Sequence, residues 1–117
     1  MKKKLKNRFE KKLDAQLKKS KRKYVYEKVK IPYTLSGLYY PDWIVYHNSG
    51  DGFFLIEAKG HFRPEAKRKM VAVKQQHPEL DIRIVFYSAN KKYIKWAEKY
   101  GFPYAIGDIP EEWLNGK

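Results

Sequence analysis

Residues 41–60 read PDWIVYHNSGDGFFLIEAKG, and this stretch decides the fold. Two short apolar runs, 43–46 and 53–56, flank a cluster of Asn, Asp and Gly residues, which is the pattern of a β-hairpin. If the turn is symmetric about its middle, Asp42 and Glu57 face each other with Cβ atoms about 5 Å apart. A slip of one residue in this register would place the two carboxylates on opposite faces of the sheet.

These two acids and a nearby lysine form a candidate reactive group. Lys59 lies two residues after Glu57, so both side chains point to the same face of the strand. Two facing carboxylates repel each other, and their oxygens suit Mg²⁺, with Mn²⁺ as a substitute. Such an ion would polarise a phosphate oxygen and activate a bound water, while Lys59 orients that water, which indicates phosphodiester hydrolysis. A charged, solvated strand face is the alternative interpretation of the same spacing.

The charge of the chain is placed unevenly. The formal net charge is +13, and residues 1–30 hold fourteen Lys and Arg against Glu10, Asp14 and Glu27. This asymmetry favours a polyanion as partner, nucleic acid first, over a basic arm that only aids solubility. The basic residues predicted to contact DNA phosphates are Lys2, Lys3, Lys4, Lys6, Arg8, Arg63, Lys67, Arg68 and Lys74.

Length and composition exclude several classes of protein. A chain of 117 residues predicts one domain, and its ten Tyr, six Phe and three Trp argue for a folded core. The chain has no cysteine, so disulfides and thiolate metal sites are excluded. No apolar run is long enough to span a bilayer. We therefore expect a cytoplasmic protein with no membrane partner.

Periodicity along the chain predicts a mixed α/β domain, with a central β-sheet flanked by helices. Leu5, Phe9, Leu13 and Leu17 recur every four residues and predict a helix over residues 3–19. The other predicted elements are strands over residues 24–31 (ended by Pro32), 43–46, 53–56, 82–86 and 102–106, helices over 64–76 and 90–100, and one helical turn over 110–114. Pro64, Asn90 and Gly101 mark the ends of the later helices.

Glu10 lies on the shoulder of the apolar stripe of the first helix. A carboxylate at this position could reach into a site under the helix. It could equally pair with the surrounding lysines one turn away, and geometry alone favours that pairing.

The spacing of Asp42 and Glu57-x-Lys59 resembles the signature of the PD-(D/E)xK nuclease superfamily. Within it, residues 75–86, QQHPELDIRIVF, closely resemble a segment of the phage endonuclease I family, which resolves Holliday junctions. The resemblance extends over roughly residues 9–115 and includes the segments Phe9-Glu10, Tyr26–Tyr33 and Ile109–Trp113.

This resemblance implies a restriction-endonuclease-like fold and an intertwined, domain-swapped homodimer with two composite active sites. It also implies that Asp42, Glu57 and the Ala58 carbonyl ligate Mg²⁺ or Mn²⁺, and that Lys59 serves the water or the scissile phosphate. Glu10 would join the metal site from the partner subunit. The implied substrates are four-way junctions and other branched DNA, read by shape, with no small-molecule substrate and a phage role in the bacterial cytoplasm.

The chain is accordingly expected to be one nuclease domain, residues 1–117. Its predicted parts are a basic arm (1–8), a helix plus strand exchanged between subunits (9–33), a bridge (34–41) and a catalytic core (42–117). The bridge is shorter than is usual in the family, which bears on the geometry of the exchange. The alternative functions are a non-catalytic basic DNA-binding protein and a nuclease of the same superfamily that acts on linear DNA.

Overall fold

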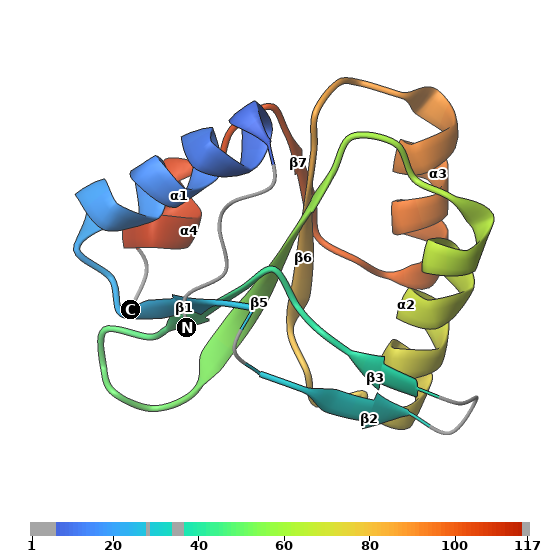
Figure 1. Ribbon diagram of the computed structural model, residues 1–117, viewed down its shortest axis with the longest axis horizontal. Helices are drawn as coiled ribbons and strands as arrows, with labels where there is room; N and C mark the ends of the chain where they lie inside the picture. The colour runs from blue at the N-terminus through green and yellow to red at the C-terminus, as the bar shows by residue number, and fades with distance from the viewer. Residues whose placement is uncertain (1–6, 28, 34–36, 116–117) are drawn as a thin grey trace.

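The computed structural model describes residues 7–27, 29–33 and 37–115, and it shows a mixed sheet with helices on both faces (Figure 1). The predicted α/β class is confirmed. The five-stranded sheet has the order β1 (Tyr24–Tyr26), β4 (Trp43–Tyr46), β5 (Phe53–Lys59), β6 (Ile82–Phe86), β7 (Tyr104–Ile106). Its first three strands run antiparallel, and β5, β6 and β7 run parallel. A separate two-stranded sheet pairs β2 (Ile31–Tyr33) with β3 (Gly37–Tyr39).

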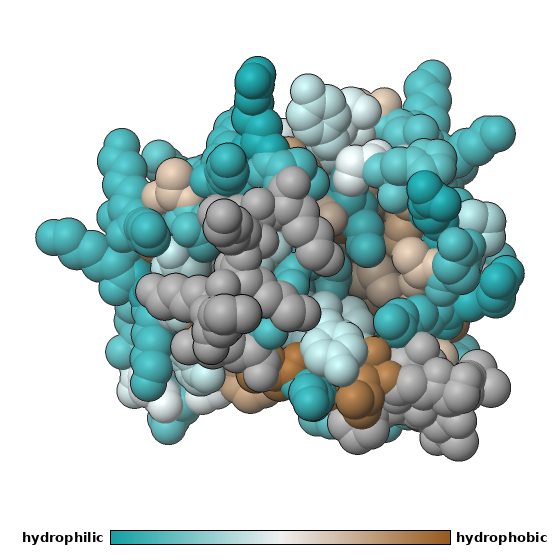
Figure 2. Space-filling model, in the orientation of Figure 1, coloured by the Kyte–Doolittle hydropathy of each residue, from teal (hydrophilic) through white to brown (hydrophobic). Residues whose placement is uncertain are grey.

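Helices cover both faces of this sheet and bury two clusters of apolar side chains. Helices α1 (Arg8–Ser20) and α4 (Glu111–Asn115) lie on one face, and α2 (Pro64–Gln76) and α3 (Lys91–Tyr100) lie on the other (Figure 1). Trp43 and Ile56 point into the cluster under α1, whereas Ile44 and Leu55 point into the cluster under α2 and α3. The strands of the sheet centre are therefore apolar on both faces, while long hydrophilic side chains surround the molecule (Figure 2).

Local end signals place most helix boundaries where the sequence predicts them. The Asn90 side chain accepts the N–H groups of Lys92 and Tyr93 at the start of α3, and Gly101 ends α3 with a left-handed φ of 76°. Helix α2 and strand β6 have the predicted bounds. Helix α1 begins at Arg8, where Asn7 caps it; residues 3–6 of the predicted helix lie outside the described residues.

The predicted strand over residues 24–31 is wrong. Strand β1 ends at Tyr26, because Glu27 adopts a left-handed φ of 49° and the chain leaves the main sheet there. Pro32 does not end a strand; it lies inside β2, in a two-stranded sheet where its missing N–H is tolerated. The predicted bridge over 34–41 contains β3, which folds back on β2 as a hairpin.

None of the described helices is long and apolar enough to cross a bilayer.

Arg22, which follows α1, forms hydrogen bonds with the backbone of α4 near the end of the chain. Its side chain is buried, with 4% of the residue exposed, and its guanidinium donates to the carbonyls of Tyr46 (3.1 Å) and Leu114 (2.7 Å). Nearby, the side chain of Gln16 exchanges two hydrogen bonds with the backbone of Ile109, at 3.0 and 3.2 Å. These contacts hold α4 against the segment that carries α1.

We expect Arg22→Met to lower the free energy of unfolding by about 2–4 kcal/mol, because the buried carbonyls it pairs would lose their donors. Denaturant titration measures this loss. The matched control is Lys21→Met, an exposed neighbour, which should change stability by less than about 0.5 kcal/mol. Equal stability of the two variants would contradict the role given to Arg22.

Candidate active site

Three acidic residues form one row at the end of the sheet. The β4–β5 register pairs Trp43 with Ile56, and its continuation places Asp42 opposite Glu57, as the symmetric turn predicts. The β1–β4 register in the same way places Glu27 opposite Asp42, and the Glu27 N–H donates to the Asp42 carbonyl at 3.1 Å. Residues that are opposite each other in antiparallel strands lie close together. Three neighbouring strands therefore bring three carboxylates to one end of the sheet.

Asp42 and Glu57 are buried, with 9% and 3% of their surfaces exposed. One carboxylate oxygen of Asp42, Oδ2, accepts the backbone N–H of Ala58 at 2.9 Å. Burial and the charge of Glu57 raise the pKa of Asp42 well above its usual range, and the Ala58 hydrogen bond opposes them only in part. Two acids buried this close together are under electrostatic strain that a bound cation would relieve.

Helix α1 adds Glu10 to this group. Asn7 caps the backbone N–H of Glu10 at 2.8 Å, which fixes the first turn of the helix above the end of β1. The Tyr26 hydroxyl donates to Glu10 Oε1 at 2.7 Å, and burial together with Glu10 and Glu27 raises the pKa of that phenol, so Tyr26 remains a donor. Glu10 is 5% exposed and lies in the site. Its burial beside Asp42 agrees with a carboxylate that reaches under the helix, which is the position that the family resemblance implies.

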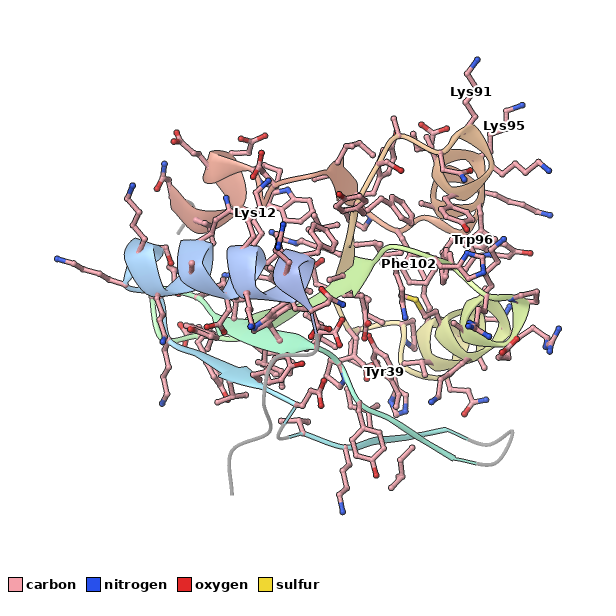
Figure 3. All side chains as sticks on the ribbon, turned by 45° about the horizontal axis from the view of Figure 1, so that its top comes forward. Lys12, Tyr39, Lys91, Lys95, Trp96 and Phe102 are labelled. Atoms are coloured by element: carbon pink, nitrogen blue, oxygen red, sulfur yellow. The ribbon has the colours of Figure 1, made fainter. Side chains whose placement is uncertain are left out.

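The carboxylate oxygens of Glu10, Glu27 and Asp42 can all lie within 4.8 Å of one another. Two further buried atoms, Glu57 Oε1 and the Tyr39 hydroxyl, have no hydrogen-bond partner among the described residues. Burial and the charge of Glu57 raise the pKa of Tyr39, the last residue of β3, which is labelled in Figure 3. An unpaired buried carboxylate oxygen destabilises the fold unless something else binds it. The all-oxygen donor set fits a hard divalent cation, Mg²⁺ or Mn²⁺.

Lys59 lies at the mouth of the group. Its Nζ is 3.8 Å from Glu57 Oε2, and its side chain is 23% exposed, so a substrate can reach the ammonium. The same Nζ lies 5.8 Å from the centre of the Phe62 ring, on the face of the sheet covered by α2 and α3. The structure therefore brings together Glu10, Asp42, Glu57 and Lys59, the four catalytic residues predicted from the sequence.

The predicted DNA-contacting residues are spread more widely. Arg8 is exposed at the start of α1, while Arg63 and Arg68 are exposed at and beyond the start of α2. Lys67 lies over the rings of Phe62 and Tyr93, and Lys74 over Phe102, so these two lysines also cover the apolar core. Lys2, Lys3, Lys4 and Lys6 lie outside the described residues. Contact of any of them with DNA stays a prediction.

Three further residues lie at this site that the sequence did not predict: Glu27, Tyr26 and Tyr39. Tyr26 ends β1 and Glu27 directly follows it, and the pairing of β1 with β4 joins segments that are not consecutive in the chain. Only a prediction of that register could have found them. Tyr39 comes from the β2–β3 hairpin, which the sequence pattern did not reveal.

The geometry defines an acidic, oxygen-lined site with one accessible lysine, built at the end of a mixed sheet. The sequence model of the family described as phage endonuclease I matches residues 2–117, and the chain belongs to this family. It is 35% identical to endonuclease I of Escherichia phage T7 over 117 positions, which cover 91% of this chain and 75% of that relative. It is 36% identical to endodeoxyribonuclease 1 of Enterobacteria phage T3 over 113 positions, covering 87% and 71%. The resemblance to the phage endonuclease I family is confirmed.

Proposed function

We propose that this protein is an endodeoxyribonuclease that cuts branched DNA, four-way junctions included, by hydrolysis that depends on Mg²⁺. The observation that carries the proposal is the buried pair of Asp42 and Glu57 directly beside Lys59, in which one Glu57 oxygen has no hydrogen-bond partner within the described part of the chain. The names of the two phage relatives, an endonuclease and an endodeoxyribonuclease, agree with cleavage of DNA.

Asp42, Glu57, Glu10 and the Ala58 carbonyl would hold the cation, with Glu27 as an additional carboxylate. Bound there, a divalent cation would polarise the scissile phosphate and acidify an attacking water. The Ala58 N–H holds Asp42 Oδ2 in place, and the Tyr26 hydroxyl holds Glu10 Oε1, so these side chains are oriented before substrate arrives. The Lys59 ammonium orients the water or stabilises the charge that develops on the phosphate.

The charge of the chain supports DNA as the substrate. With a net charge of +13, the protein should attract a phosphate backbone, and its affinity should fall steeply as salt is added. A purely DNA-binding protein would gain nothing from burying several carboxylates that repel the substrate. The buried carboxylates therefore favour catalysis over the non-catalytic alternative.

The test compares cleavage of a four-way junction with cleavage of a linear duplex of matched sequence, each with Mg²⁺, with Mn²⁺ and with a chelator. We expect paired nicks near the branch point, at least about tenfold faster than cutting of the duplex, and no cutting in the chelator. Equal rates on both substrates would replace the proposal with a nuclease for linear DNA. Binding without cutting under every cation would replace it with the non-catalytic role.

We also propose that the protein works as a homodimer in the bacterial cytoplasm. The structure is of one chain, in which Glu10 lies beside Asp42 of the same chain. The β2–β3 hairpin connects the segment that carries Glu10 to the catalytic core. If that connection opened, the same contacts could form between two chains, which is the subunit exchange expected from the sequence.

A further inference from the structure

The most exposed large apolar side chain among the described residues is Tyr87, which is 64% exposed. It directly follows β6, at the same end of the sheet as the candidate active site. The β5–β6 register pairs Phe86 with Lys59, and the Tyr87 N–H donates to the Lys59 carbonyl at 3.0 Å. Neighbouring strands are about 4.8 Å apart, so the backbone of Tyr87 lies one strand away from that of Lys59, while its ring points to the opposite face of the sheet, toward Phe9 of α1.

The ring of Tyr87 is held in place from one side. Phe9 meets it edge to face, with the ring centres 5.4 Å apart and the planes at 79°. Phe9 precedes Glu10 in the first turn of α1, and Arg8, one residue earlier, is exposed. The two rings therefore form a wall on the α1 face of the sheet, between the start of α1 and the end of β6, and Phe9 directly precedes Glu10 of the site. We call Phe9 and Tyr87 the aromatic wall.

Stability does not explain why Tyr87 is aromatic. Most of its surface faces water, and replacing such a side chain usually changes stability very little. An exposed aromatic ring at the end of the sheet that carries the site, close to the exposed Arg8, is well suited to stacking against a nucleic acid base, because every base offers a flat π-face. A base inside a duplex has both faces covered by its neighbours, so it is not available for such a contact. Branched DNA can offer a base whose stacking is interrupted.

We propose that the aromatic wall binds one unstacked base of the DNA next to the bond that is cut, and that this contact helps select branched over linear DNA. The inference rests on the proposed function, since it assumes that DNA enters the site. It adds a contact between the protein and a DNA base, whereas the contacts predicted from the sequence are with phosphates. Stacking does not read sequence, so it fits recognition by shape.

The experiment measures binding in a chelator, so that no cleavage is needed. A four-way junction carries 2-aminopurine either beside the branch point or in the middle of one arm. We expect the wild-type protein to change the fluorescence of the first probe and not the second. Tyr87→Leu should abolish that change and weaken junction binding about tenfold, with duplex binding altered less than about twofold. Tyr87→Phe and Tyr87→Trp should retain both the signal and the affinity.

Phe53→Leu is the matched control. Phe53 is also an exposed aromatic, 40% exposed, and it contacts one ring, Tyr46, at 6.2 Å. It begins β5, six residues before Lys59 and so roughly 20 Å from the site, and its replacement should leave junction binding unchanged. Thermal melting of each variant shows that the fold is kept.

The outcomes separate this inference from the proposed function. Cleavage of junctions by a Tyr87→Leu protein that also keeps the wild-type fluorescence change and affinity would overturn the aromatic wall alone. A fluorescence change that depends on Tyr87, in a wild-type protein that cuts no DNA under any cation, would overturn the proposed function alone. Absence of DNA binding by the wild-type protein would overturn both.

Discussion

Asp42→Asn should abolish DNA cleavage and, in the absence of metal, make the protein more stable. The asparagine keeps an oxygen for the Ala58 N–H but removes the charge that the proposed cation would need. Under the proposed function Asp42 is a direct ligand, and its loss would remove several kcal/mol of transition-state stabilisation, so cleavage with Mg²⁺ should fall by about 10³ or more. A time course of junction cleavage measures the first effect.

The gain in stability follows from the raised pKa of Asp42. A carboxyl whose pKa is higher in the folded state than in the unfolded state binds its proton more tightly when folded. The metal-free wild-type protein should therefore lose stability as the pH rises above about 4, the usual range for Asp, and continue to lose it until the pH passes the raised pKa. Asparagine has no proton to lose, so at pH 8 the variant should be more stable by about 1–2 kcal/mol.

Denaturation in a chelator at pH 4 to 8 measures this second effect. Asp51→Asn is the matched control, because Asp51 is an exposed acid in the loop of the same hairpin. It should leave both cleavage and the pH dependence unchanged. A metal-free Asp42→Asn protein that is less stable than the wild type at pH 8 would show that the buried carboxylates are not under the repulsion described above.

Glu10→Ala and Lys59→Ala chains should each lose activity by about 10² or more, because each removes a charge from the site. Refolded together, they should recover activity if α1 is exchanged between subunits. About half of the dimers would then be mixed, and one of the two sites in each mixed dimer would be intact, which returns about a quarter of the wild-type sites. Cleavage rates of the purified mixture measure the recovery.

The control for this experiment mixes Glu57→Ala with Lys59→Ala. Both residues lie on β5, so every site keeps one damaged residue whether or not α1 is exchanged. This mixture should remain inactive. If the Glu10 and Lys59 variants also fail to rescue each other, while differently tagged chains are shown to pair, each site is complete within one chain, as Glu10 and Asp42 are placed in the structure.

The sequence predicted those parts of the fold whose signals are local. The symmetric Gly-rich turn correctly paired Asp42 with Glu57, and the cap residues Asn90 and Gly101 correctly marked the ends of α3. Both signals lie within the element that they define. The candidate residues Asp42, which directly precedes β4, and Glu57 and Lys59 on β5 were therefore predicted from spacing alone, whereas Glu10 required the family resemblance.

The remaining features depend on contacts between distant segments. Glu27 joins the row of acids only because β1 pairs with β4. Its backbone has a left-handed φ, a conformation usually adopted by glycine, so a glutamate at this position gave no sign that the strand ends there. The alternation of residues 24–31 is equally compatible with one strand or two. Two strands form because β2 pairs with β3 in a hairpin and packs against α2, away from the main sheet.

The bonds of Arg22 and Gln16 to the last part of the chain have a kinetic consequence. Leu13 and Leu17 of α1 are fully buried, and the segment around them is fastened to residues 109–114 by side-chain hydrogen bonds. If two chains had exchanged this segment, they could separate only after the leucines left the core of the neighbouring subunit and the hydrogen bonds broke. The free-energy barrier to separation would then be comparable to that of unfolding. Such dimers should then persist for hours without exchanging subunits. Mixed dimers would therefore form readily only when the two kinds of chain are folded together.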